Sequence, residues 1–175
     1  MSTPYKPPEY HTSAVEALYS GFRRARLDFA VYLPDSLLDG LEQTLLARQE
    51  IATYQCSRED EGVAMAAGAA LVGRRPVVLM EGSGIGLSGL ILARCVAQHT
   101  GFLIVAGHNS ALGERFDYHA ATRLVTEPIL NALGVPLHVA LGTTPLDELI
   151  VQLQRTVEGQ RIPAALLIPS FVIRD

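Results

Sequence analysis

The chain has 175 residues, of which 49% are hydrophobic, and a formal net charge of −4. This length allows one globular domain with a sizeable core. The acidic balance excludes the strongly basic surface that binds nucleic acid or an anionic membrane, so we expect neither as a partner.

The cysteines and the ends of the chain exclude further classes. Cys56 and Cys95 are the two cysteines, which fits a reduced compartment, and no Cys or His spacing predicts a metal site. The proline-rich start is unlike a signal peptide, and no apolar run is long enough to span a bilayer. We predict a cytoplasmic protein that supplies no metal ligands of its own.

Apolar spacing predicts strands and helices in alternation after a short arm. Residues 1–11 are polar and proline-rich and predict an extended arm, followed by one domain over residues 12–175. The first predicted elements are a helix over 12–26, a strand over 28–33, a helix from Asp35 or Ser36 to Leu46, and a strand over 50–55.

The alternation continues to the end of the chain. The predicted elements are a helix over 57–72, a strand over 77–80, a glycine loop over 81–89, a helix over 90–98, a strand over 102–106, a polar loop over 107–117, a helix over 121–133, a strand over 137–141, a helix over 144–158 and a strand over 163–168. Such alternation requires right-handed crossovers. The sequence therefore predicts an α/β fold, a doubly wound and mostly parallel sheet of about six strands with helices on both faces.

Three acidic residues crowd the start of the helix predicted from Ser57. Ser57 is a good N-cap, and Asp60 has the spacing of a capping box. Glu59, Asp60 and Glu61 could simply complement the positive end of the helix dipole. Alternatively, one of them points into a protected cleft, where its carboxyl exchanges a proton with a bound heterocycle.

Polar loops follow the first three predicted strands. They carry Pro34-Asp35-Ser36, Ser57-Arg58-Glu59 and Glu81-Gly82-Ser83-Gly84. In doubly wound sheets, ligands bind beyond the carboxyl ends of the strands, where the strand order reverses. If the first strand is central, these three loops meet there and form the candidate site.

The glycines at 84, 86 and 89 also match the G-x-G-x-x-G pattern of dinucleotide-binding domains. The pattern lies after the third strand instead of opening the domain. The next strand ends in Gly107-His108, where a nicotinamide dinucleotide site needs an acidic residue. A tight turn between strand and helix is the simpler interpretation.

Four blocks of the sequence together resemble a known family. They are "ALYSGFRRARLDFAVYLPDSLLDGL" (17–41), "SREDEGVAMAAGAALVGRRPVVLMEGSGIGLSGL" (57–90), "GHNSALGE" (107–114) and "TEPILNALGVPLHV" (126–139). The chain resembles the pyrimidine-binding domain of thiamine-diphosphate-dependent 2-oxo acid decarboxylases. The resemblance is greatest to the alpha subunit of sulfopyruvate decarboxylase and the matching half of phosphonopyruvate decarboxylase.

The resemblance implies roles for several residues. Glu59 stands nine residues before Gly68, as the family's glutamate does before its glycine, and would bind the aminopyrimidine ring of the cofactor and favour its imino tautomer. Ser83 and Gly84 match the loop beside the cofactor, although a structural turn explains them equally. Asp35 and Ser36 match the loop that faces the 2-oxo acid, although both are also good N-caps.

The histidines fit the family pattern poorly. Some relatives place a catalytic histidine at the end of the third strand, where this chain has Met80. His108 and His119, which flank the long loop, are candidate substrate residues at an open cleft edge. The sulfopyruvate-type pattern has Arg-Gly where this chain has His108-Asn109, which leaves the anionic group of the substrate open.

The chain lacks the Gly-Asp-Gly motif with which this family holds the diphosphate and Mg²⁺. The resemblance therefore implies half an active site, completed by a beta subunit that carries this motif and holds thiamine diphosphate by its diphosphate. It also implies self-association, for which the slim helix at 59–72 is suited. Carboligation, another 2-oxo acid, and a non-catalytic nucleotide-binding module remain alternatives.

Overall fold

The computed structural model describes residues 9–109 and 119–174. Its six strands form one sheet in the order β2-β1-β3-β4-β6-β5, and every neighbouring pair is parallel. The strands are β1 (Phe29–Tyr32), β2 (Ala52–Gln55), β3 (Pro76–Glu81), β4 (Leu103–His108), β5 (Leu137–Val139) and β6 (Ala164–Pro169). The predicted doubly wound parallel sheet is confirmed.

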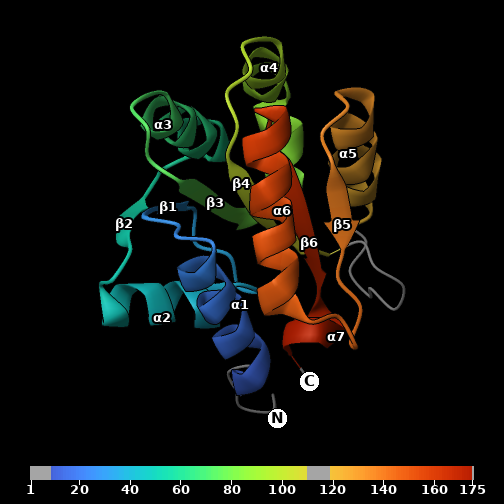
Figure 1. Ribbon diagram of the computed structural model, residues 1–175. Helices are drawn as coiled ribbons and strands as arrows, with labels where there is room; N and C mark the ends of the chain where they lie inside the picture. The colour runs from blue at the N-terminus through green and yellow to red at the C-terminus, as the bar shows by residue number, and fades with distance from the viewer. Residues whose placement is uncertain (1–8, 110–118, 175) are drawn as a thin grey trace.

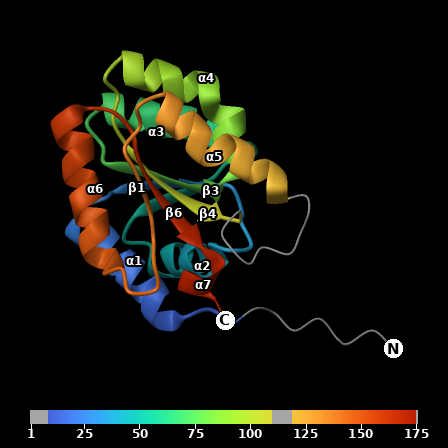
Figure 2. The ribbon, with the colours of Figure 1, turned by 90° about the vertical axis from the view of Figure 1, so that its right-hand side faces the viewer.

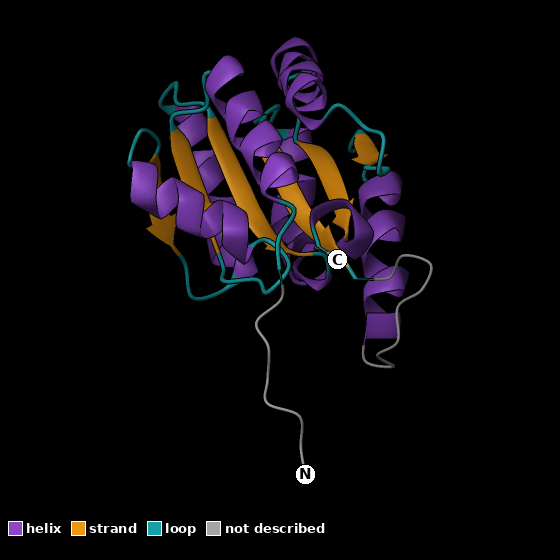
Figure 3. Ribbon diagram, turned by 90° about the horizontal axis from the view of Figure 1, so that it is seen from below, coloured by secondary structure: helices purple, strands orange, loops and turns teal. Residues whose placement is uncertain are grey.

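Helices connect the strands and cover both faces of the sheet (Figures 1 and 2). Within the described ranges they are α1 (Thr12–Arg24), α2 (Asp39–Arg48), α3 (Glu59–Leu71), α4 (Ser83–Ala97), α5 (Ala120–Ala132), α6 (Leu146–Gln160) and α7 (Ser170–Ile173). Helices α1, α2 and α6 lie on one face, and α3, α4 and α5 lie on the other (Figure 3). The short α7 was not predicted.

The sheet separates two hydrophobic cores, and β3 contributes to both of them. Val77 and Leu79 point into the core under α1, α2 and α6, whereas Val78 and Met80 point into the core under α3, α4 and α5. All four side chains are buried, because successive residues of a strand face opposite sides. A strand covered on both faces needs no polar alternation, as its sequence predicted.

The strand order reverses between β1 and β3. These two strands are hydrogen-bonded neighbours, but the chain leaves β1 for the edge strand β2 before it returns to β3. The loops after β1 and β3 consequently lead away in opposite directions. The switch point predicted beside the first strand is therefore present, and a functional site there stays a prediction.

The predicted loop at 81–89 is wrong, because helix α4 already begins at Ser83. Gly84 and Gly86 lie inside the helix and permit close packing. A Cβ atom on Gly86 would lie 3.0 Å from Val125 Cβ of α5. Glycine is unfavourable inside a helix, so the pattern was mistaken for a loop.

The predicted start of α2 is also wrong. The helix begins at Asp39, and neither Asp35 nor Ser36 is its N-cap. The Asp35 carboxylate instead accepts a hydrogen bond from the Leu37 N–H group at 3.1 Å. Side chains of this type often bond to the backbone two residues further on, which forms a turn in place of a helix cap.

The described ends of the chain lie side by side. Tyr10 forms an antiparallel bridge with Arg174, and the His11 N–H group donates to Ile173 O at 2.9 Å. Most of the predicted arm lies outside the described residues. The polar loop predicted at 107–117 overlaps the end of β4, which extends to His108, and residues 110–118 lie outside the description. No helix among the described residues is long and apolar enough to cross a bilayer.

Candidate functional site

Glu81 joins four elements at the carboxyl ends of β3 and β4. Its Oε2 accepts hydrogen bonds from the Ser83 N–H group at 3.0 Å and from the Ser83 hydroxyl. Its Oε1 accepts from Asn109 Nδ2 and from Thr122 Oγ1, each at 3.2 Å. Thus one carboxylate fixes the beginning of α4 relative to β4 and α5.

Glu59 lies directly against the beginning of α4. It is the half-buried first residue of α3, at the carboxyl side of β2. A Cβ atom on Gly84 would lie 2.4 Å from Glu59 Cγ and 2.8 Å from Glu59 Cβ. Only glycine permits this approach, so α3 and α4 begin in contact. The structure therefore brings together two residues that the sequence predicted at one site.

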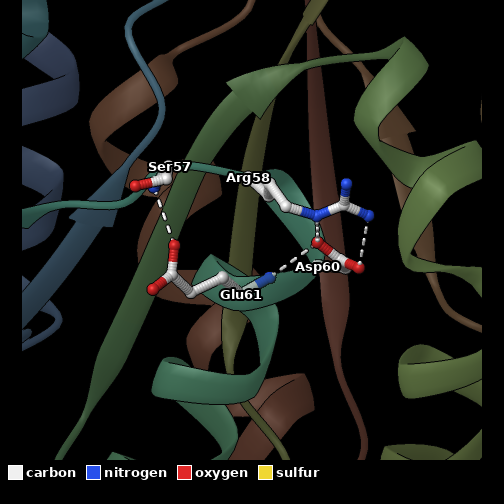
Figure 4. A network of polar contacts seen from close by, with 4 residues as sticks. All are labelled: Ser57, Arg58, Asp60 and Glu61. Carbon is white, nitrogen blue, oxygen red and sulfur yellow. Dashed lines mark hydrogen bonds and ion pairs between the residues drawn. The ribbon is translucent and has the colours of Figure 1, made fainter.

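The other two acids of α3 have different partners. Glu61 Oε2 accepts from the Ser57 N–H group at 2.8 Å, and Asp60 pairs with the Arg58 guanidinium at 3.0 Å (Figure 4). Hydrogen bonding to Arg58 lowers the pKa of Asp60. The predicted capping box is wrong, because Arg58 is the N-cap and the acid that reaches back is Glu61. Glu59 is the acid of the three that packs on α4.

Asp35 is buried in the turn that follows β1, with 6% of its surface exposed. Its Oδ2 atom has no hydrogen-bond partner and lies against β4, where a Cβ atom on Gly107 would be 2.5 Å away. Burial raises the pKa of Asp35 to about 6; the Leu37 N–H group opposes this shift and the Glu81 charge adds to it. Asp35 therefore belongs to the cluster at the switch point.

Glu42 is a buried carboxyl that the sequence analysis missed. It is 2% exposed, and its Oε1 accepts the Asp35 N–H group at 3.1 Å. Burial raises the pKa of Glu42 to about 8. The signal was present, because Glu42 follows Leu38 by four positions and precedes Leu45 by three, which places it on the apolar side of α2.

The remaining predicted residues lie in different surroundings. Ser36 is exposed, and its carbonyl accepts the Tyr10 hydroxyl at 2.9 Å. His108 is buried at the end of β4, not at an open edge, and its Nε2 lies 3.2 Å from Glu127 Oε1. Burial lowers the pKa of His108, although Glu127 opposes the shift. His119 is half-buried and immediately precedes α5.

A surface hollow adjoins the beginning of α3. It is lined by Ser57, Arg58, Asp60, Glu61, Ala64 and Ile91. Among residues 9–109 and 119–174, no three His, Cys, Asp or Glu side chains are arranged to hold a metal ion.

Known proteins share both the sequence and the fold. The chain is 30% identical over 139 residues to the sulfopyruvate decarboxylase alpha subunit of Methanothermobacter thermautotrophicus, which covers 79% of this chain and 84% of the relative. The corresponding subunit of Methanococcus maripaludis is 25% identical over 91% of this chain and 96% of its own. No protein-family model matches the chain.

A solved structure shows the same fold at low sequence identity. The 2-oxoglutarate:ferredoxin oxidoreductase of Magnetococcus marinus, solved with 2-oxoglutarate, coenzyme A and succinyl-CoA bound, superposes with a TM-score of 0.67 and 16% identity. The match covers 99% of this chain and 32% of that chain. At this identity the likeness concerns the fold alone.

The six-stranded parallel sheet with helices on both faces defines a doubly wound α/β domain, the fold that it shares with part of this oxidoreductase. Within that class, the chain belongs to the sulfopyruvate decarboxylase alpha-subunit family, because the relationship extends over most of both sequences. The resemblance stated from the sequence is confirmed.

Proposed function

We propose that the chain is the pyrimidine-binding alpha subunit of a thiamine-diphosphate-dependent decarboxylase that acts on a small anionic 2-oxo acid, such as sulfopyruvate or phosphonopyruvate. The observation that carries this proposal is the contact of Glu59 with Gly84 in a chain that belongs to the sulfopyruvate decarboxylase alpha-subunit family. Glu59, to which the resemblance assigns the pyrimidine ring, is the acid of α3 that contacts Gly84.

The residues present fit the pyrimidine half of the cofactor. Because Gly84 has no side chain, the half-buried Glu59 side chain can lie against the beginning of α4, where its carboxyl is offered to the ring. In this proposal Glu59 holds a proton at the ring nitrogen, while Ser83 and Gly84 line the ring. When bound, thiamine diphosphate supplies the electron sink for decarboxylation.

The substrate is proposed to lie among the residues that follow β1 and β4. Asp35 presents an unpartnered carboxyl oxygen there, and Ser36, His108 and His119 remain candidates for the anionic substrate. An ionised Asp35 would repel a carboxylate. Since burial raises the pKa of Asp35 to about 6, its protonated form is within reach near neutral pH and can donate a hydrogen bond.

A beta subunit that carries a Gly-Asp-Gly motif is proposed to hold the diphosphate and Mg²⁺. An apolar surface on α3, α4 and α5 supports an interface with another chain. Its exposed large side chains are Leu71, Leu87, Leu90 and Leu124. Exposed apolar side chains on one layer of helices are typical of interaction surfaces. The same layer carries Glu59, the first residue of α3.

The test is co-expression with such a beta subunit, followed by measurement of carbon dioxide release from a panel of 2-oxo acids. We expect release from sulfopyruvate or phosphonopyruvate by the complex, dependent on thiamine diphosphate and Mg²⁺, and none by either chain alone. A complex that binds the cofactor and releases no carbon dioxide from any acid on the panel would contradict the proposal. Condensed products instead of aldehydes would point to carboligation.

A further inference from the structure

Two carboxyl groups are buried together behind the switch point. Asp35 is 6% exposed and Glu42 is 2% exposed, and they belong to the turn after β1 and to α2. The Glu42 Oε1 atom accepts the Asp35 N–H group at 3.1 Å. Glu42 therefore holds the backbone of the turn that carries Asp35, without being part of the open end of the sheet.

The Asp35 side chain divides its two oxygens between the turn and the site. Oδ1 accepts the Leu37 N–H group at 3.1 Å, whereas the buried Oδ2 atom has no hydrogen-bond partner and lies against Gly107. A buried acceptor without a partner is costly, and such groups are often functional. The orientation of Asp35 Oδ2 is thus built into the fold.

Few charges surround the pair. Glu42 faces Asp35, Asp39 on its own helix and the hydroxyl of Tyr32 on β1. Asp35 in turn faces Glu81 at the end of β3 and the guanidinium of Arg174.

Helix α1 packs on α2 as well, and its charged contact with that helix joins Glu16 to Arg48, which lies at the far end of α2. Within residues 9–109 and 119–174, the cation that acts on Asp35 is Arg174, and its guanidinium also bonds to the Tyr10 hydroxyl. Two ionised carboxyls in this position would repel each other without a matching number of cations.

We infer that Glu42 is a positioning residue for Asp35. The buried Glu42 carboxyl fixes the turn through the Asp35 N–H group and so presents Asp35 Oδ2 to the carboxylate of the 2-oxo acid. This inference rests on the proposed function for the identity of the substrate, whereas the carboxyl pair itself does not depend on it.

The physical reason is that burial disfavours the second negative charge. Burial raises the pKa of Asp35 to about 6 and that of Glu42 to about 8, where the charge of Asp35 adds to the effect. The pair therefore titrates in two coupled steps. An ionised Glu42 places a charge in this buried position beside Asp35 and Asp39, which destabilises the turn that holds Asp35.

The sign of the pH dependence follows from the raised pKa of Glu42. Its ordinary value is 4.5, so between 4.5 and about 8 the folded chain holds a proton that the unfolded chain has released. The stability supplied by neutral Glu42 is complete below 4.5 and is lost as the pH rises through 8. The raised pKa of Asp35 likewise makes stability fall with rising pH, up to about pH 6.

The pair is tested in the full-length chain, without cofactor or partner. We expect carboxyl ¹³C NMR titration to give the two raised pKa values in the wild type, and the thermal midpoint to fall as the pH rises from 6 to 8. In Glu42→Gln, which keeps the oxygen that accepts the Asp35 N–H group, at least half of that fall should disappear. Glu148→Gln, which changes an exposed carboxyl on α6, should leave the fall unchanged.

The positioning role is tested in the complex with the beta subunit. We expect Glu42→Gln to keep wild-type kcat/KM at pH 7 and to lose the decline of activity above pH 8. Glu42→Leu, which removes the acceptor, should lower kcat/KM at least tenfold. Activity in Glu42→Leu equal to the wild type would overturn the positioning role.

The two proposals fail in distinguishable ways. A wild-type Glu42 that titrates near pH 4.5 would overturn the carboxyl pair whatever the enzyme does. An inactive wild-type complex would count against the decarboxylase. In that case the positioning role is tested by the pKa of Asp35 in Glu42→Leu. We expect this pKa to shift toward its ordinary value, and an unchanged Asp35 pKa would refute positioning by Glu42.

Discussion

Glu59 shows how neighbouring acids in one helical turn acquire different roles. Asp60 is held by Arg58 and Glu61 by the Ser57 N–H group, so both bond within their own segment. Glu59 instead packs on Gly84, which is distant in sequence. A carboxyl held by another element can face a ligand in the space that the two elements share.

We predict that Glu59→Gln abolishes decarboxylation while the complex still assembles. An amide cannot exchange a proton with the ring nitrogen, and general acid–base groups contribute about 10²- to 10⁴-fold to rate. A decrease in kcat of at least a hundredfold is therefore expected by carbon dioxide assay. Glu61→Gln is the matched control and should retain activity, since its amide oxygen can still accept the Ser57 N–H group. Full activity in Glu59→Gln would refute the assigned role.

Gly84→Ala should have the same consequence through packing. Its new Cβ atom would lie 2.4 Å from Glu59 Cγ, so the Glu59 side chain must move. We expect a folded chain with decarboxylase activity reduced at least tenfold. In Gly89→Ala, on the same helix, the nearest atom would be Ile129 Cγ2 at 3.9 Å, so activity should be unchanged. Equal activity in the two variants would show that the contact has no function.

At the scale of the elements, α4 illustrates how one sequence pattern serves two purposes. Its glycines match a nucleotide-binding loop in sequence, but in the structure Gly84 and Gly86 let α4 approach α3 and α5 closely. The helix then begins at Ser83, fixed by the carboxylate of Glu81. The positions of these glycines are set by neighbouring helices, which the local sequence does not reveal.

The layer of α3, α4 and α5 gives a prediction about assembly. Leu90 on α4 is 67% exposed, so a lysine there costs the isolated chain little. If this layer binds the beta subunit, Leu90→Lys should weaken the complex at least tenfold by isothermal titration calorimetry. Leu141→Lys is the matched control, because Leu141 is 60% exposed and lies outside these helices. Undiminished affinity in Leu90→Lys would remove this surface from the interface.

At the scale of the whole molecule, the two cores on opposite faces of the sheet differ in how they relate to the candidate site. The core under α1, α2 and α6 includes neither Glu59 nor Gly84, whereas α3 and α4 carry these residues over the other core. Glu42 and Asp35 join the first core to the switch point. Changes between α1 and α6 should therefore affect stability before activity.

Gly21→Ala tests the packing of α1 on α6. Its Cβ atom would lie 2.8 Å from Ile150 Cβ and 3.0 Å from Asp147 Cα, so the helices must separate. Overpacking of this kind costs about 1–3 kcal/mol of unfolding free energy, measurable by urea denaturation. Gly159→Ala in α6 meets no atom within 4 Å and should stabilise the chain by about 0.5–1 kcal/mol. A loss of stability in Gly159→Ala equal to that in Gly21→Ala would exclude the packing explanation.

The sequence by itself determined the order of elements, the parallel sheet and the loops that meet at its switch point. An apolar run without polar alternation, such as Val77–Met80, predicts a strand that is covered on both faces of the sheet, and this pattern can be read from the local sequence. The block around Glu59 was likewise sufficient to indicate the family, which the relatives confirm.

Only the tertiary structure decided which carboxyl groups work together. Glu42 reaches Asp35 across seven positions through a turn, and Glu59 contacts Gly84 although α3 and β3 lie between them in the sequence. The beginnings of α2, α3 and α4 also differed from the predicted ones: Asp35 bonds to the Leu37 N–H group, Glu61 takes the place expected of Asp60, and α4 starts before its glycines. Burial and proximity depend on the whole fold, and they determine whether a carboxyl keeps its proton.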